Sequence, residues 1–558
     1  MSRTHPVGRP TTAPRDPDVT VTVIVHNDAD RLPRAVASVR AQTHRAIEIV
    51  ISDDHSTDAT PRVAAELAAR DDRIRVLRLE RNSGGCGVPR NRAMDIARAP
   101  FLMFLDSDDE LPPKAVELLL AAHAEDDVDF TMGAVERIRT DTATTSLWMP
   151  SLFDRRRTVH GIEAEPRLLF EPLSTNKMYR REFLDRHALR FPEGLHYEDQ
   201  LFSAQAYTLA RAFRVITEPV YRWYFAPYAA ADSATISNRR HLIANVRDRI
   251  TIARRIDAFL TERNSPAALR EEKDFKFLSH DLRLYAGDLP YRDLDWIAEF
   301  AAETVPYLDG LSGAAYERLG RAERVVVGLL RDGRYEEVRL AARGLAHATA
   351  PRETVGDRTG RTYWGAVPPR CEASRRDLDI TDWDLADCPF AAAGFRHEIT
   401  RVERGPGGTV DLDLRTYDPG RRLALAPHVA ALHLAPAGRR LTTRLRLDPA
   451  GRGVFEGTVR LDPGAASLPV YGFAGVRHPV LELTDGPAHN TGVVLAPPSF
   501  EPFDVPGPGR HRITVEPEGR DAGRLQLRWQ PRGVVGRLLV PVGRRAPVRK
   551  AAKALIRG

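Results

Sequence analysis

A run of five apolar residues that ends in a cluster of acids constrains the fold of this chain most strongly. The run is Phe101–Leu105, and it leads directly into Asp106, Ser107, Asp108 and Asp109. An unbroken apolar run of this length is typical of a strand buried on both faces of a parallel sheet. In open α/β sheets, ligands bind outside the carboxyl ends of the strands. An Asp-x-Asp pair there can hold a hard divalent cation that bridges phosphate oxygens, and the alternative is an acidic loop without a ligand.

The length and composition of the chain limit its class. Its 558 residues are too many for one hydrophobic core, so we expect two to four domains. The 42% hydrophobic and 28% charged residues are typical of soluble globular proteins, and no apolar run reaches the roughly 18 residues of a transmembrane helix. Cys86, Cys371 and Cys388 are too scattered for a disulfide framework or a zinc site, which favours a reducing cytoplasm.

The two ends of the chain differ in composition from the rest. Residues 1–18 contain many Pro and Thr and no apolar core, which predicts a disordered leader rather than a signal peptide. Residues 532–558 carry eight Lys and Arg and no acid, and subtracting them from the total of +6 leaves −2 for the remainder. The excess positive charge is therefore that of a tail and not of a nucleic-acid-binding surface. This tail either contacts the inner face of an anionic plasma membrane or is a solvated end.

The N-terminal region alternates between strand and helix patterns. We expect strands at 19–25, 46–52, 73–79, 101–105 and 130–138, and helices at 30–42, 56–69 and 91–97. This alternation with short connections predicts a parallel, doubly wound α/β sheet.

The remaining residues change character twice. Helical patterns dominate residues 239–350, which we interpret as a helical linker domain. Short alternating strands separated by Gly and Pro predict a β-sandwich at 366–500, and a smaller β element is expected at 505–531. Aromatic residues in this region fit a β-domain core better than a sugar-stacking surface; they are Trp364, Trp383, Tyr417, Tyr471 and Phe473.

Five blocks in the first 240 residues occur in a defined order, at 21–28, 40–43, 48–60, 82–92 and 104–109. In this order and spacing they resemble the family 2 glycosyltransferases, whose catalytic domain has the GT-A fold, a Rossmann-like α/β fold. The resemblance implies a GT-A domain over residues 19–238. It further implies an inverting enzyme that transfers a hexose or N-acetylhexosamine from a UDP-sugar, with Mn²⁺ or Mg²⁺ as cofactor.

The resemblance assigns the donor-binding residues. The segment around Val25 and Asn27 would form the floor for the base, with His26 where the family usually has Tyr. Asp53 would accept the imide N–H of uracil, while Asp54 would anchor the loop. Further contacts to the nucleotide sugar are expected from Asn82, Arg90, Asp106 and Ser107.

Asp108 is expected to bind the metal ion, together with Asp106, which lies near the ribose. Asp109 fits a structural role better. Sugar transfer with inversion also needs a base for the acceptor hydroxyl, and the block at 196–202 resembles the family's Glu-Asp motif. We assign Asp199 as the base and Glu198 as its positioning neighbour.

Two histidines are weaker candidates for the same chemistry. His196 is the second choice for the base, although a histidine at this position is explained equally well by packing or by a polar side chain at the surface. His241 could reach the metal if a loop closes, and it otherwise has no assigned role.

The overall layout resembles the polyribitol-phosphate glycosyltransferases of wall teichoic acid, which join a GT-A domain, a helical linker and immunoglobulin-like modules. This resemblance implies a role in cell wall biogenesis, with UDP-N-acetylglucosamine as the candidate donor. The acceptor would be a teichoic-acid-like polyol phosphate or its lipid-linked precursor. It also implies a homo-oligomer, with a trimer expected.

Two other functions remain possible from the residues. A nucleotidyltransferase or pyrophosphorylase of related fold normally has a Gly-rich basic loop after its first strand, and residues 26–29 here read His-Asn-Asp-Ala. A catalytically inactive scaffold or glycan-binding protein is disfavoured by the intact acids Asp53, Asp106, Asp108, Glu198 and Asp199.

Overall fold

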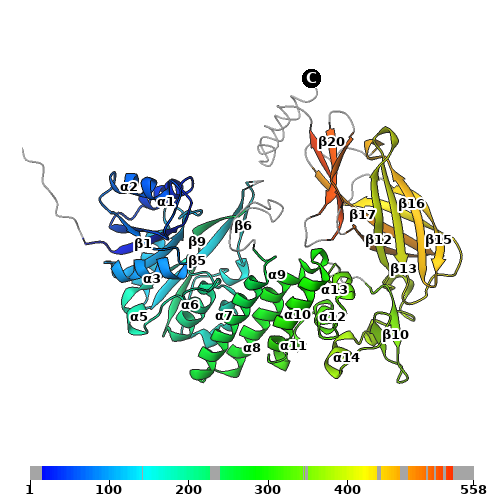
Figure 1. The fold of residues 1–558 in the computed structure, drawn as a ribbon, viewed down its shortest axis with the longest axis horizontal. Helices are drawn as coiled ribbons and strands as arrows, with labels where there is room; N and C mark the ends of the chain where they lie inside the picture. Colours follow the sequence, from blue (N-terminus) through cyan, green and yellow to red (C-terminus); the bar gives the residue numbers. More distant parts are fainter. Residues whose placement is uncertain are drawn as a thin grey trace, which may run out of the picture. The chain divides into compact units, whose positions relative to one another are not determined.

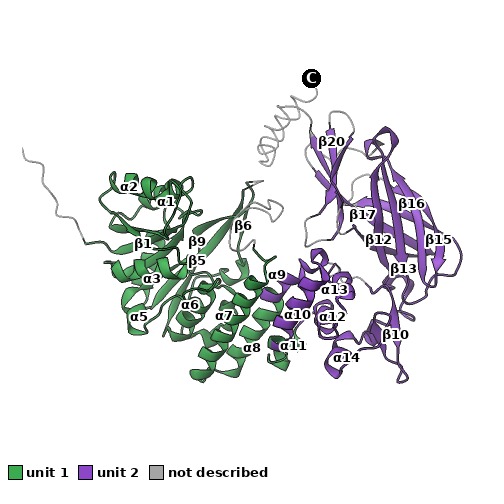
Figure 2. Ribbon diagram, viewed as in Figure 1, with its two compact units in different colours: residues 1–280, 307–318 green, residues 281–306, 319–558 purple. Residues whose placement is uncertain are grey.

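The computed structural model describes residues 16–140, 143–225, 239–343, 345, 350–435, 442–465, 475–497, 500–507, 511–518 and 523–531. Residues 1–15 of the expected leader, the whole expected basic tail, and Tyr471 and Phe473 lie outside these residues. The chain divides into two compact units (Figure 2). Unit 1 comprises residues 1–280 and 307–318, and unit 2 comprises residues 281–306 and 319–558.

Unit 1 is built on a nine-stranded sheet with the order β3-β2-β1-β4-β8-β5-β9-β7, and β6 pairs with β5 (Figure 1). The pairs β2–β3, β1–β2 and β1–β4 are parallel, as expected, and β8 lies antiparallel between β4 and β5. The strands are β1 (Val19–Val25), β2 (Ile47–Asp53), β3 (Ile74–Arg78), β4 (Phe101–Asp106), β5 (Phe130–Arg139), β6 (Thr145–Leu147), β7 (Arg157–Val159), β8 (Lys177–Arg180) and β9 (Phe213–Phe225).

Helices cover both faces of this sheet. Figure 1 shows α1 and α2 on one side of β1, and α3 and α5 on the other. All seven residues of β1 are buried, and so are the apolar side chains at helical spacing on α1, which explains why these elements form a core. The helices are α1 (Leu32–Arg40), α2 (Thr60–Ala68), α3 (Gly87–Ile96), α4 (Ala115–Glu125), α5 (Arg181–Arg186) and α6 (Glu198–Leu209).

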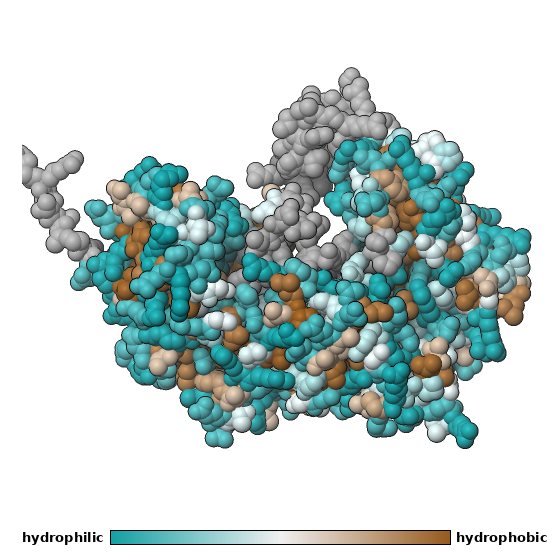
Figure 3. Space-filling view, in the orientation of Figure 1, coloured by the Kyte–Doolittle hydropathy of each residue, from teal (hydrophilic) through white to brown (hydrophobic). Residues whose placement is uncertain are grey.

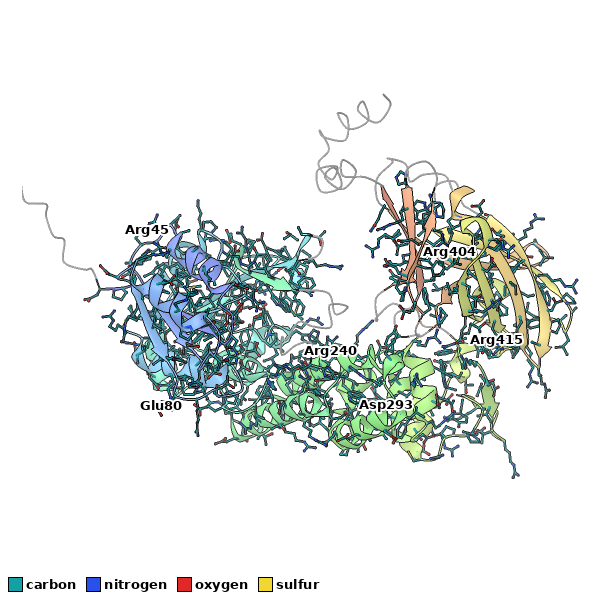
Figure 4. The ribbon with its side chains drawn as sticks, turned by 45° about the horizontal axis from the view of Figure 1, so that its top comes forward. Arg45, Glu80, Arg240, Asp293, Arg404 and Arg415 are labelled. Atoms are coloured by element: carbon teal, nitrogen blue, oxygen red, sulfur yellow. The ribbon has the colours of Figure 1, made fainter. Side chains whose placement is uncertain are left out.

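The carboxyl ends of the parallel strands all lie on one side of the sheet. Figure 4 labels Arg45, which precedes β2, and Glu80, which follows β3, on opposite sides of the sheet. The carboxyl ends of β1, β2 and β4 lie on the Glu80 side. This is the edge at which the sequence predicts the ligand site.

Helices dominate residues 239–343, as predicted. They are α7 (Ile243–Glu262), α8 (Ala267–Lys276), α9 (Leu282–Ala286), α10 (Leu294–Leu308), α11 (Gly313–Glu317), α12 (Arg321–Arg331) and α13 (Tyr335–Ala342). Helices α11 and α12 are separate, because Gly320 between them has an extended backbone. Helices α7 and α8 belong to unit 1, whereas α12 and α13 belong to unit 2.

Unit 2 is rich in β-structure, as predicted, and its strands from β12 to β21 form one barrel-like sheet. The order is β14-β15-β16-β13-β12-β18-β17-β21-β20-β19, and an additional β14–β17 pairing closes a ring. The strands are β12 (Arg396–Arg404), β13 (Val410–Tyr417), β14 (His428–Ala435), β15 (Thr442–Gly451), β16 (Val454–Leu461), β17 (Gly475–Asp485), β18 (Ala488–Leu495), β19 (Phe503–Pro506), β20 (His511–Pro517) and β21 (Leu525–Pro531).

The smaller β element expected at 505–531 is part of this same sheet, because β21 pairs with β17. The segment at 366–395 contains no named strand; it includes helix α14 (Glu372–Leu378) and follows the hairpin of β10 (Thr354–Gly356) and β11 (Thr362–Trp364). Trp364 and Tyr417 are buried, as expected for core residues, and Trp383 packs edge-on against Trp364.

The face of the molecule that Figure 3 shows is mainly hydrophilic. Figure 3 shows hydrophobic side chains in small separate patches on the face in view. Within the described ranges, no helix is long and apolar enough to cross a lipid bilayer.

Candidate functional site

The register of the parallel strands brings the predicted donor residues to one edge. Val25, the last residue of β1, lies opposite Asp53 of β2, and Ile24 lies opposite Asp106 of β4. Since adjacent strands are about 4.8 Å apart, Asp53 and Asp106 are held about 10 Å apart across β1. This arrangement follows directly from the ends of three predicted strands.

Asp53 and Asp54 have different surroundings. Asp53 is fully buried, and its Oδ1 accepts a hydrogen bond from the Ser56 N–H at 2.9 Å. Its Oδ2 is buried without a hydrogen bond to any described residue, although the Arg78 Nε lies 3.5 Å away. The Asp54 carboxylate instead accepts from the backbone N–H and the hydroxyl of Ser83, at 3.0 and 2.9 Å. Asp54 therefore anchors the loop after β3, whereas Asp53 Oδ2 accepts no hydrogen bond from the described residues.

His26, Asn27 and Asn82 form a polar cluster beside these acids. The Asn82 amide nitrogen donates to the Asp54 carbonyl at 3.1 Å and lies 3.1 Å from His26 Nδ1. Asn27 has a left-handed φ of 49°, and its Oδ1 accepts from the Thr57 N–H at 2.8 Å. These contacts brace the loops that follow β1, β2 and β3.

Arg90 is the link between the two predicted carboxylate groups. It lies on α3 with 4% of its side chain exposed. Its Nη1 donates to Glu198 at 2.5 Å, and its Nη2 donates to Asp106 at 2.8 Å. Burial alone would lower the pKa of Arg90, but the carboxylates of Asp106 and Glu198 outweigh it and raise that pKa. Arg90 thus holds the first turn of α6 against the end of β4.

Asp106 and Asp108 are the two carboxylates that could hold a cation. Their side chains are 34% and 29% exposed. Burial and then the charge of Asp106 raise the pKa of Asp108 to about 6. A divalent cation would remove that repulsion. Because Mg²⁺ and Mn²⁺ are commonly held by one or two carboxylates together with substrate phosphates, these residues fit such an ion.

The described side chains supply only part of the ligand set of a metal ion. No group of three or more His, Cys, Asp or Glu side chains in the described ranges is arranged to hold a metal ion. The remaining ligands would have to be phosphate oxygens and water.

The neighbours of the Asp-x-Asp pair are held by residues that we did not predict. Ser107 donates to Asp28 at 2.6 Å, and Arg31 bridges Asp28 and Asp108 at 2.7 and 3.4 Å. Ser107 is 8% exposed, and its hydroxyl already forms a hydrogen bond with Asp28. No local pattern marks Asp28 or Arg31 for this role, because Ser107 and Asp108 lie more than 70 residues away from them in the sequence.

Asp109 is a structural residue in this loop. Its Oδ2 accepts from the Tyr221 hydroxyl at 2.7 Å, and its Oδ1 accepts from the Tyr224 N–H at 2.8 Å. Both partners lie on β9. The carboxylate is 3% exposed, and burial raises its pKa well above the usual range.

Asp199 has the properties of a proton acceptor. It lies in the first turn of α6, next to Glu198, and is half-buried. In the part of the chain that the structure describes, its carboxylate forms no hydrogen bond or ion pair with another side chain. Burial, and then the charge of Glu198, raise the pKa of Asp199 to about 7. A carboxylate with a pKa near neutral can accept a proton efficiently.

The two histidine alternatives are placed differently. His196 Nδ1 lies 2.6 Å from Asp248 of α7, so its ring is already paired. His241 is exposed just before α7.

The N-terminal part of the chain is similar in sequence to known glycosyltransferases. Residues 20–188 match the model of glycosyl transferase family 2, and this segment is a family 2 glycosyltransferase domain. Over 215 residues, 37% of this chain, it is 34% identical to the putative glycosyltransferase EpsH of Bacillus subtilis. Over 180 residues, 32% of this chain, it is 30% identical to the poly(ribitol-phosphate) β-N-acetylglucosaminyltransferase TarS of Staphylococcus aureus. The matches span 60% of EpsH and 30% of TarS.

The fold comparison extends beyond this domain. The crystal structure of S. aureus TarS covers 93% of this chain, and this chain covers 86% of it, with a TM-score of 0.50 and 17% sequence identity. The likeness shows a related fold, which confirms the predicted order of GT-A domain, helical region and C-terminal β-structure.

Proposed function

We propose that this chain is a metal-dependent, inverting glycosyltransferase that uses a UDP-sugar. The observation that carries the proposal is the single guanidinium of Arg90, which joins the Asp106-Ser-Asp108 edge to the Glu198-Asp199 turn. A donor edge and an acceptor base must be held together for direct displacement at the sugar C1. The family 2 domain that covers both Arg90 and Asp108 supports the same reaction.

The donor would bind at the carboxyl edge of β1, β2 and β4. The Asp53 Oδ2, which lacks a hydrogen bond within the described residues, suits the imide N–H of uracil. The loop of His26 and Asn82 lies beside it and suits contacts to the base. Asp106 and Asp108 would hold Mn²⁺ or Mg²⁺, which stabilises the negative charge of the departing nucleoside diphosphate.

Asp199 would act as the base. Its carboxylate would take the proton of the acceptor hydroxyl while the hydroxyl oxygen bonds to C1 and the bond from C1 to the diphosphate oxygen breaks. Attack from the face opposite the leaving group inverts the anomeric centre. Glu198, fixed by Arg90, would hold the turn that carries Asp199 and would raise the pKa of that base.

The acceptor assignment rests on relatives. TarS and TarP of S. aureus are named poly(ribitol-phosphate) β-N-acetylglucosaminyltransferases, which supports UDP-N-acetylglucosamine as donor and a polyol phosphate polymer or its lipid-linked precursor as acceptor. The overall resemblance further supports a homo-oligomer, with a trimer expected, and light scattering of the full chain tests it. Free thiols at Cys86, Cys371 and Cys388 suit the reducing cytoplasm, where peripheral membrane contact through the tail remains a proposal.

A panel of nucleotide sugars tests the proposal. We expect slow hydrolysis of one UDP-sugar, with UDP released only when Mn²⁺ or Mg²⁺ is present. Calorimetry should show metal-dependent binding of UDP. If no UDP-sugar is hydrolysed and UDP does not bind with either metal, the proposed function is wrong, and the pyrophosphorylase or scaffold alternatives would be reconsidered.

A further inference from the structure

Three aromatic rings surround the guanidinium of Arg137, a residue with no role assigned so far. Its Cζ lies 4.3 Å from the ring centre of Phe225, 5.0 Å from that of Trp223 and 5.1 Å from that of Trp148. Arg137 lies on β5, opposite Trp223 of β9 and Ser146 of β6. We call Arg137, Trp148, Trp223 and Phe225 the aromatic cage.

The aromatic cage contains hydrogen-bond donors without acceptors. Within the described ranges, Arg137 forms no hydrogen bond or ion pair, and its Nε is buried. Burial lowers the pKa of Arg137, and no carboxylate offsets the effect. The adjacent acid, Glu136, is paired with Arg222 at 3.0 Å. The Trp148 Nε1–H is also buried, with no acceptor among the residues that the structure describes. Buried donors without partners are rare and costly, so a missing acceptor is indicated.

The aromatic cage lies next to the proposed reaction edge. Trp223 is two residues beyond Tyr221 on β9, a step of roughly 7 Å along the strand. The Tyr221 hydroxyl donates to Asp109 at 2.7 Å and accepts from the Asp106 N–H at 3.3 Å. A ligand bound at Trp223 would therefore lie two residues along β9 from Tyr221, the residue that contacts the Asp-x-Asp loop.

We propose that the aromatic cage binds a phosphodiester group of the acceptor, so that the acceptor is a polyanion rather than a neutral glycan. This inference rests on the proposed function and defines its substrate class. The guanidinium presents paired N–H donors that match phosphate oxygens, and the rings hold it in place while they exclude water. The Trp148 N–H supplies a further donor. A repeating polymer could place one phosphate here while a hydroxyl of a nearby unit reaches Asp199.

Calorimetry with three probes tests the proposal: a synthetic hexamer of ribitol phosphate, maltohexaose as a neutral oligomer, and UDP with Mn²⁺. We expect Arg137→Gln to weaken hexamer binding by roughly 10- to 100-fold, since a charge-assisted hydrogen bond is lost. Trp148→Phe keeps an aromatic ring but removes the N–H donor, and it should weaken hexamer binding by roughly 2- to 10-fold. Both variants should bind UDP normally, which also shows that they fold.

The matched control is Arg62→Gln, which removes one positive charge from an exposed, 69% accessible side chain on α2 and should leave hexamer binding unchanged. Quenching of tryptophan fluorescence by the hexamer should disappear in Arg137→Gln, and this readout does not depend on catalysis.

Unchanged hexamer binding in Arg137→Gln would overturn the proposal. Equal weakening of UDP and hexamer would assign the cage to the donor instead and would overturn it too. Tight binding of maltohexaose that depends on Arg137 would also contradict it. A wild-type chain that binds the hexamer but neither UDP nor any UDP-sugar would refute the proposed function and leave the anion site intact.

Discussion

The Nη1 of Arg90 lies 2.5 Å from the Oε1 of Glu198, and the two side chains are 4% and 7% exposed. The residues are 108 positions apart in the chain. The same guanidinium contacts Asp106, so one buried cation fixes the distance between the strand end that would bind the donor and the turn that would carry the base. Its removal should affect stability as well as chemistry.

Arg90→Met should destabilise the protein strongly. Glu198, whose side chain is 7% exposed, would be left buried without its cation, and breaking a buried pair typically costs about 3–5 kcal/mol. Urea unfolding measures the loss. Arg92→Met on the same helix is the control, because Arg92 is 57% exposed and its pair with Asp95 spans 3.5 Å; its change should stay within about 0.5 kcal/mol. Equal losses in the two variants would show that the Arg90 pairs do not stabilise the fold.

Asp199→Asn should lower kcat by roughly 10²–10⁴-fold, since it keeps the shape but cannot accept a proton. Donor affinity should change little, because UDP would bind at Asp53, Asp106 and Asp108. In the wild type, Asp199 must be deprotonated to act, and its pKa is about 7. We therefore expect kcat to fall about tenfold per pH unit below pH 7. The pH profile of the residual activity in Asp199→Asn should lack this acidic limb.

Glu198→Gln gives a complementary test. Because the charge of Glu198 helps to raise the pKa of Asp199, the acidic limb of the pH profile should move to lower pH in this variant. The loss of kcat should be smaller than in Asp199→Asn. His196→Ala serves as a control, since His196 is paired with Asp248. A near-normal kcat for Asp199→Asn, with a collapse for either of the other two variants, would move the base to that residue.

Asp108→Asn should abolish Mn²⁺- or Mg²⁺-dependent transfer while the fold is retained. Asp109→Asn is a matched control, because Asp109 is held by Tyr221 and Tyr224 and should mainly affect stability. Initial rates over a metal titration distinguish the two. Undiminished wild-type activity in excess EDTA, or full activity of Asp108→Asn, would contradict a metal role for this residue.

The donor edge was predictable because its signals are local. A buried strand can be predicted from its run of apolar residues, and the acids that follow the run must lie at the end of that strand. Asp53, Asp106 and Asp108 could therefore be placed at the strand ends from the sequence. Helix and strand ends shifted by a few residues, as at α2, which begins at Thr60 rather than Ser56. Side-chain capping does not fix that start, since Ser56 instead accepts from Asn27.

The contacts that organise the site could not be predicted, because their partners are distant in sequence. The sequence predicts that Arg90 contacts the nucleotide sugar. No residue near it in sequence indicates that its side chain is buried and donates to both Asp106 and Glu198. The aromatic cage joins Arg137 and Trp223, which are 86 residues apart and meet only when β5 and β9 pair. The joining of β21 to β17 in unit 2 likewise depends on tertiary pairing and not on strand pattern.

Unit 2 should lose stability in acid through Glu398. Burial would raise the pKa of this carboxyl, but the guanidinium groups of Arg396 and Arg352 outweigh it and lower the pKa to about 2, from 4.5. A depressed pKa contributes stability that is fully present above about pH 4.5 and is lost as the pH falls towards 2. With 3% of the side chain exposed, the contribution is on the order of 3 kcal/mol.

Thermal unfolding of the wild type and of Glu398→Gln between pH 7 and pH 2 measures this contribution. Other carboxylates titrate in both proteins, so the informative quantity is the difference between them. The wild type should be more stable by a constant amount above about pH 5, because Gln cannot neutralise the buried Arg396. That difference should narrow steadily below pH 4.5, as Glu398 becomes protonated. A difference that stays constant down to pH 2 would show that this ion pair does not set the acid sensitivity of unit 2.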